Sequence, residues 1–242
     1  MKKLLFVLIL LLATQSFHAQ SKWFTRERLA NDATAGRGSI DNKRFSYGYY
    51  LGFNSYDFKI DYKNQFDNDN TDILVEKTTG FNVGLVGDMC LHEYINLRLE
   101  PGLYFTQRTL DFPGLLGAKD SLRDVRSTYI HVPLLVKFST KRLNNVKPFV
   151  LAGVSTSLNL SSNQKNPEDN EQGKFRMTNN TFYYELGFGI DFYLFYFKFT
   201  PSIRGVFAMS DELVADDDPN SPWTGNIEKL SSRAIFINFT FQ

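Results

Sequence analysis

Cysteine is almost absent from this 242-residue chain, in which Cys90 is the single example. One cysteine excludes an intramolecular disulfide framework and any cysteine-rich metal site. Histidine is also scarce, with three in the chain. The chain also lacks a Gly-x-Ser-x-Gly element, the turn that presents the nucleophile in many hydrolases. We therefore expect neither catalytic residues nor a cofactor or metal site.

Long apolar runs are missing after the first twenty residues. A membrane-spanning helix needs about 20 consecutive apolar residues, so a helical membrane protein is excluded. An excess of either charge is missing as well, because 27 Lys and Arg face 26 Asp and Glu. A near-neutral chain argues against nucleic acid as the main partner.

The first residues have the layout of a secretory signal peptide. Two lysines precede an apolar run over 4–13, and small and polar residues follow it up to Ala19. The apolar run is too short to cross a bilayer. We expect residues 1–19 to be a signal peptide cleaved after Ala19, with cleavage after Ser16 as the alternative.

Apolar alternation is what the rest of the chain has in quantity. From Ile95 to Phe105, apolar residues fill the odd positions except 101, a proline, and most even positions are polar or small. Strict alternation predicts a strand, and about eleven residues is the length of a tilted transmembrane strand. The pattern recurs, which predicts eight strands at about 45–60, 81–91, 95–105, 129–138, 146–159, 182–193, 195–204 and 235–241.

The apolar positions of the first strand change parity near Asn54-Ser55. This change predicts either a β-bulge at that point or the exit of the strand from the membrane.

The connections between the strands alternate in length. Four are long and polar, at 61–72, 112–127, 160–179 and 210–231, and three are short, at 92–93, 141–145 and 194–195. Outer-membrane barrels have long external loops, short periplasmic turns and an even strand number. We predict an all-β fold over 45–242, an eight-stranded antiparallel transmembrane up-and-down β-barrel in the outer membrane. A soluble lipocalin-type barrel is the alternative, although it would not require this asymmetry.

The segment between the leader and the first strand, residues 20–44, is polar and lacks alternation. We expect it to be a periplasmic N-terminal arm, with Trp23 and Phe24 as anchors at the membrane interface. A disordered leader is the other interpretation.

Charged residues occupy the inward positions of the predicted strands. They are four acids and four bases: Asp88, Arg98, Glu100, Lys137, Glu185, Asp191, Lys198 and Arg204. The interior of an eight-stranded barrel is just wide enough for side chains, and an unpaired buried charge is costly. We therefore expect these groups to form a paired network that fills the lumen and leaves no pore.

Two histidines and two acidic stretches are the remaining candidates for chemistry. His92 lies in a short turn, and His131 points inward, where we expect a structural hydrogen-bonding role; a barrel enzyme acting on lipid or peptide is the alternative. Residues 67–72 resemble the start of an EF-hand loop but lack its Gly at the sixth position and its Glu at the twelfth. We interpret them, and the acidic residues of 211–218, as solvated loops rather than calcium sites.

Several stretches resemble a known family. Residues 42–60 are similar to the first strand of PorT proteins, outer-membrane components associated with the type IX secretion system of Bacteroidetes. The segments 129–138, 147–153 and 185–191 resemble strands common to the larger barrel superfamily, although relatives often have Glu where His131 stands. The resemblance implies a non-enzymatic role in exporting proteins with C-terminal sorting signals and, in some species, in gliding motility. It supplies no catalytic residues.

The partners implied are outer-membrane lipid and other secretion-system proteins, without nucleic acid or a small-molecule substrate. The alternative function is a structural or adhesive barrel that binds ligands through its external loops.

Overall fold

The computed structural model describes residues 44–63, 72–112, 121–162, 176–194, 196–215, 221 and 223–242. The elements that these residues form are all β-strands. Within these ranges, no helix has the length and apolar character needed to cross a bilayer. The predicted signal peptide and all but the last residue of the predicted arm lie outside the described residues.

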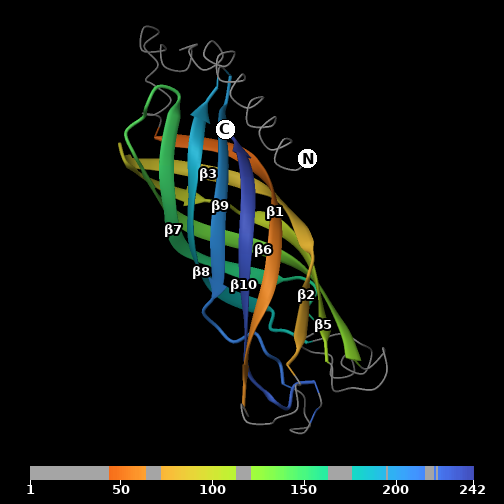
Figure 1. Cartoon of the computed structure of the whole chain (residues 1–242). Coiled ribbons are helices and arrows are strands. Elements are labelled where there is room, and N and C mark those ends of the chain that lie inside the picture. Colours follow the sequence, from red (N-terminus) through yellow and green to blue (C-terminus); the bar gives the residue numbers. More distant parts are fainter. Residues whose placement is uncertain are drawn as a thin grey trace, which may run out of the picture.

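The strands form one antiparallel sheet that closes on itself. In chain order they are β1 (Phe45–Tyr62), β2 (Leu74–Lys77), β3 (Thr79–His92), β4 (Ile95–Leu99), β5 (Gly102–Asp111), β6 (Leu122–Ser139), β7 (Val146–Asn159), β8 (Asn180–Tyr193), β9 (Lys198–Ala208) and β10 (Ile227–Phe241). β6 pairs with β7, β7 with β8, β8 with β9, and β9 with β10. β1 pairs with both β10 and β3, and β4 and β5 lie between β3 and β6 and pair with both (Figure 1). The result is a closed barrel.

The ten segments make eight barrel strands. β2 and β3 are parts of one strand interrupted at Thr78, and β4 and β5 are parts of another interrupted at Glu100-Pro101. Pro101 has no N–H for the sheet, but its carbonyl accepts the N–H of Leu85 at 2.9 Å. The predicted eight-stranded barrel is confirmed.

The short connections and the C-terminus share one end of the barrel, drawn at the top in Figure 1. One predicted boundary is wrong there, because β9 begins at Lys198 and not at 195. The N–H of Leu194 donates to the carbonyl of Phe197 at 3.0 Å, which closes a turn in place of strand pairing. Since short turns are periplasmic in outer-membrane barrels, we assign this end to the periplasm.

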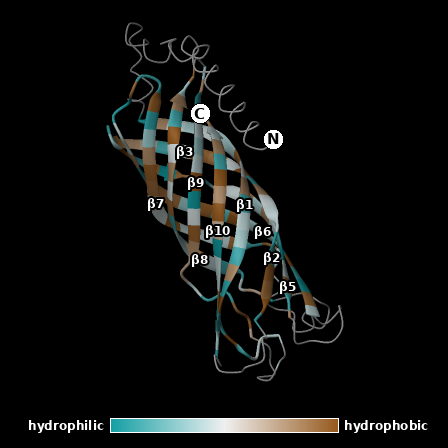
Figure 2. Ribbon diagram, viewed as in Figure 1, coloured by the Kyte–Doolittle hydropathy of each residue, from teal (hydrophilic) through white to brown (hydrophobic). Residues whose placement is uncertain are grey.

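The outer wall carries large apolar side chains. Leu85 and Phe188 are 65% and 61% exposed, and Leu99, Leu103 and Ile237 also face outward. Hydrophobic and hydrophilic residues alternate along the strands of the wall (Figure 2). Exposing so much apolar surface to water would cost about 25 cal/mol per Å². In lipid this cost disappears, so the wall suits a bilayer.

Beyond this apolar band the wall inverts its polarity. On the last part of β1, Lys59 faces outward while Phe58 is buried in the lumen. Phe58 belongs to an apolar cluster within the long-connection end of the barrel, whose buried members are Phe58, Leu110, Phe112, Val125, Met177, Ile227 and Leu230. A wall surrounded by water has polar residues outside and apolar residues inside, so the strands continue past the membrane.

The predicted bulge near Asn54-Ser55 is wrong. The pairing of β1 with β10 runs without a register shift through both residues, and the first shift lies between Asp61 and Tyr62. Even-numbered side chains of β1 point inward on both sides of Asn54. The apolar residues change sides because the surroundings of the strand change, which agrees with the alternative of membrane exit.

Two predicted external loops are partly strand, because these strands also continue past the membrane. β6 begins at Leu122 and β10 at Ile227, inside the segments 112–127 and 210–231. Polar residues on the outward face made these stretches resemble loops, while their inward apolar residues join the cluster inside the barrel.

A charge placed on the lipid-facing wall should prevent assembly. Replacing Leu99 by Arg costs about 2–4 kcal/mol near the bilayer midplane, so we expect Leu99→Arg to reduce the folded, membrane-inserted fraction in a heat-modifiability assay. Leu103→Phe, an apolar change on the same wall, should insert normally. Normal insertion of Leu99→Arg would contradict the assignment of this face to lipid.

Candidate functional site

The lumen contains all eight of the inward charges that the sequence predicts. They are Asp88, Arg98, Glu100, Lys137, Glu185, Asp191, Lys198 and Arg204, and none is more than 8% exposed. They come from β3, β4, β6, β8 and β9, together with Glu100 between β4 and β5. Alternation places each side chain inward, because neighbouring residues of a strand point to opposite faces.

In the periplasmic half of the lumen, Arg98 holds Asp88 with a two-pronged contact. Its Nε donates to Oδ1 at 2.7 Å and its NH2 group to Oδ2 at 2.6 Å. The same guanidinium donates through NH1 to Glu100 Oε1 at 3.1 Å. Planar pairs of this kind are among the strongest charge-assisted hydrogen bonds.

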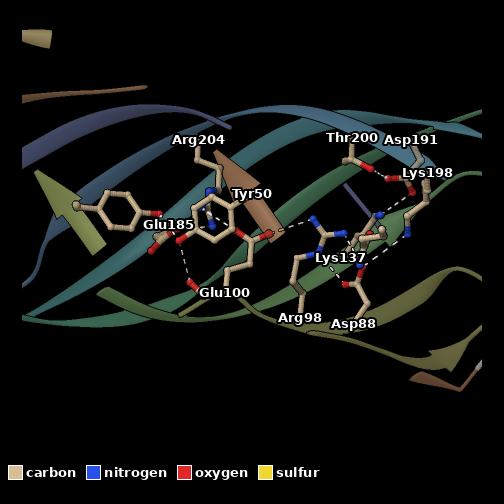
Figure 3. Close-up of polar contacts among 12 residues, drawn as sticks. Tyr50, Asp88, Arg98, Glu100, Lys137, Glu185, Asp191, Lys198, Thr200 and Arg204 are labelled. Carbon is tan, nitrogen blue, oxygen red and sulfur yellow. Dashed lines mark hydrogen bonds and ion pairs between the residues drawn. The ribbon is translucent and has the colours of Figure 1, made fainter. Parts of the chain in front are cut away.

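A second pair lies beside the first. Lys137 Nζ donates to Asp191 Oδ2 at 2.6 Å, and Thr200 Oγ1 donates to Asp191 Oδ1 at 2.7 Å (Figure 3). Lys198 Nζ lies 3.8 Å from Asp88 Oδ2 and is a second cation beside that carboxylate. Every carboxylate at this level therefore faces a cation.

Arg204 extends the network toward the middle of the lumen. Its NH2 group lies 2.9 Å from Glu100 Oε2, and its NH1 group lies 3.2 Å from Glu185 Oε2. Acids and bases thus alternate without a break from Asp88 through Arg98, Glu100 and Arg204 to Glu185 (Figure 3).

His131 ends this chain of contacts. Its Nε2 lies 2.8 Å from Glu185 Oε1, and its Nδ1 contacts Ser157 Oγ. Serine, histidine and a carboxylate are the groups of a hydrolase triad, but all three are buried here. Three rings lie against the imidazole: Tyr104, Tyr183 and Phe236. This enclosure leaves no approach for a substrate and supports a structural role for His131.

Sequence reasoning missed Arg108, which is fully buried on β5. Its NH2 group donates to Tyr129 Oη at 2.9 Å and its NH1 group to Ser232 Oγ at 3.2 Å. The guanidinium also lies 3.9 Å from the centre of the Phe58 ring, a cation–π arrangement. Arg108 has the same parity as Arg98, so continuing the alternation past 105 would have found it.

Glu212 was also missed, because it belongs to a predicted solvated loop. The connection between β9 and β10 folds back, and the carboxylate is fully buried. It accepts hydrogen bonds from Tyr183 Oη at 3.1 Å and Ser232 Oγ at 2.7 Å. Burial raises the pKa of the Glu212 carboxyl above its ordinary value. No local pattern in the sequence signals this return into the lumen.

The acidic candidates for calcium have few described members. Residues 64–71 and 216–220 lie outside the described residues, as does most of the EF-hand-like stretch. Among the residues that the structure describes, no group of three or more His, Cys, Asp or Glu is placed to hold a metal ion.

Comparison with known proteins assigns the family. The family model of the outer membrane protein beta-barrel domain matches residues 19–214. The chain belongs to this family. Family and fold together place the barrel in the outer membrane. A search of curated proteins found no match.

Solved structures of outer-membrane barrels resemble the chain. OprG from Pseudomonas aeruginosa is 18% identical, with 81% of this chain and 93% of that chain covered and a TM-score of 0.41. Neisserial surface protein A is 8% identical, with coverage of 81% and 97% and a TM-score of 0.42. Ail of Yersinia pestis is 13% identical, with coverage of 81% and 96% and a TM-score of 0.36. These TM-scores are too low to indicate a shared function.

Removing one member of the network should destabilise the barrel strongly. Arg204→Leu leaves Glu100 and Glu185 without their shared cation, and breaking a buried pair costs about 3–5 kcal/mol. We expect a lower midpoint of urea unfolding in lipid vesicles. The control is Arg233→Leu, which breaks the 2.7 Å ion pair with Asp57 on the outer wall and should cost at most about 1 kcal/mol. Equal losses in the two variants would contradict the account.

Proposed function

We propose that this barrel is a non-enzymatic component of type IX protein secretion, the export of proteins with C-terminal sorting signals that in some species also serves gliding motility. The resemblance of residues 42–60 to the first strand of PorT proteins supports this proposal. The structural observation that carries it is the filled lumen. Cargo does not pass through a barrel whose cross-section is occupied by paired charges and buried rings, so the barrel works by contact.

The network itself explains why the lumen stays closed. Opening a passage would separate pairs such as Arg98 and Asp88, which are buried and joined by bonds of 2.6 and 2.7 Å. Buried pairs are costly to break because each freed charge remains away from water. Contacts with other secretion proteins and with outer-membrane lipid must therefore involve the two rims and the wall.

A second candidate function is a structural or adhesive barrel that binds ligands at its external end. The part of the wall beyond the apolar band supports it, because this part is an ordered surface with a core of its own. Asp57 there holds two cations, Lys77 at 3.0 Å and Arg233 at 2.7 Å. Although partial burial acts to raise the pKa of Asp57, these two partners outweigh it and lower the pKa.

Deleting the gene separates the two candidates. If the barrel serves secretion, proteins with C-terminal sorting signals should accumulate in the periplasm, intact and unprocessed, and the full-length chain should restore their export. Immunoblots of periplasmic and extracellular fractions measure this, with a periplasmic enzyme as the control for leakage.

A variant in which residues 163–175 are replaced by a short turn tests the external loops. Normal export in the deletion strain would overturn the secretion proposal. If export is normal and the shortened variant no longer binds ligands at the cell surface, the adhesive candidate is supported.

A further inference from the structure

The outer wall carries a groove of about 390 Å³ on the side of β3, β5 and β6. Its lining includes Thr79, Phe81, Phe105, Gln107, Arg126 and Thr128. The groove is not part of the lumen network.

A break in the sheet creates the groove. The pairing of β3 with β5 stops at Phe81 and Phe105, and the pairing of β2 with β5 starts at Lys77 and Arg108. Three residues, 78–80, thus face two residues, 106–107. A bulge of this kind interrupts the ladder and redirects side chains, and such bulges occur next to functional sites.

The groove lies where the apolar band ends. Phe53, Phe81 and Phe105 are partners across β1, β3 and β5 and all face outward. The next outward residues toward the external end are polar, Thr79 on β3 and Gln107 on β5. Aromatic residues mark the membrane interfaces of outer-membrane barrels. This position is the level of the lipid headgroups of the outer leaflet.

The polar groups of the groove leave hydrogen-bonding capacity for a ligand. The Arg126 side chain is 74% exposed, and its 3.5 Å contact with Asp124 is long. Asp124 also accepts a hydrogen bond from Thr109 Oγ1 at 3.1 Å. Thr128, the strand partner of Phe105, also faces outward from β6. The groove therefore combines an exposed cation, a threonine hydroxyl and a shelf of two phenylalanine rings.

We propose that this groove binds the phosphorylated headgroup of an outer-leaflet glycolipid. Arg126 pairs with a phosphate, for which the guanidinium fork is well suited. The hydroxyl of Thr128 contacts the sugar, and Phe81 and Phe105 contact the first carbons of the acyl chains. The phenylalanine shelf at the membrane interface favours a lipid over free phosphate.

The test uses the purified full-length chain in neutral detergent, titrated with bisphosphorylated lipid A, with the same lipid after dephosphorylation, and with inorganic phosphate alone. We expect Arg126→Gln to weaken binding of lipid A about tenfold, because a charge-assisted bond to phosphate is lost. Dephosphorylated lipid A should bind the unmodified chain as weakly as lipid A binds the Arg126→Gln variant. Inorganic phosphate should not displace lipid A.

Two further variants keep the proposal falsifiable. Arg233→Gln changes an exposed arginine of β10, outside the residues that line the groove, and should leave the affinity for lipid A unchanged. Thr128→Trp fills the groove and should abolish binding while the thermal unfolding of the barrel stays the same. Equal binding by Arg126→Gln and the unmodified chain, equal losses in both arginine variants, or equal affinity for dephosphorylated lipid would overturn the proposal.

Discussion

An eight-stranded barrel is just wide enough for side chains, so each charge that points inward leaves water and needs a partner. The chain of contacts from Asp88 through Arg98, Glu100 and Arg204 to Glu185 meets this requirement. A slip of one residue in any of these strands would turn its charge to the outer face and leave its partners unpaired. The same network fills the lumen, so function belongs to the surfaces around it.

The surroundings of the wall decide its composition along the barrel axis. Within the membrane the apolar residues face out and the charges face in. Beyond the membrane the arrangement reverses, with Lys59 outside and Phe58 inside. One continuous sheet with one direction of alternation satisfies both surroundings. The two kinds of surface meet at the aromatic row that ends in Phe105, and the bulge that forms the groove lies at that boundary.

Alternation is a local property, so the sequence predicts the strands and the inward charges from nearby residues alone. The bulge predicted near Asn54 is wrong because the apolar residues of β1 face lipid along only part of the strand. Arg108 lies beyond Phe105, where the outward apolar residues stop, so the predicted strand ends before it. Glu212 was beyond local reasoning, since its burial depends on how the connection before β10 folds back against Tyr183 and Ser232. The groove likewise depends on strand pairing.

Ion conductance tests the central claim most directly. The full-length barrel is reconstituted in a planar lipid bilayer, with a porin as the positive control. A lumen filled by paired charges predicts no stable conducting state above that of the empty bilayer. A steady, ohmic channel formed by the folded barrel would contradict the account, because it would require a continuous water-filled path through the network.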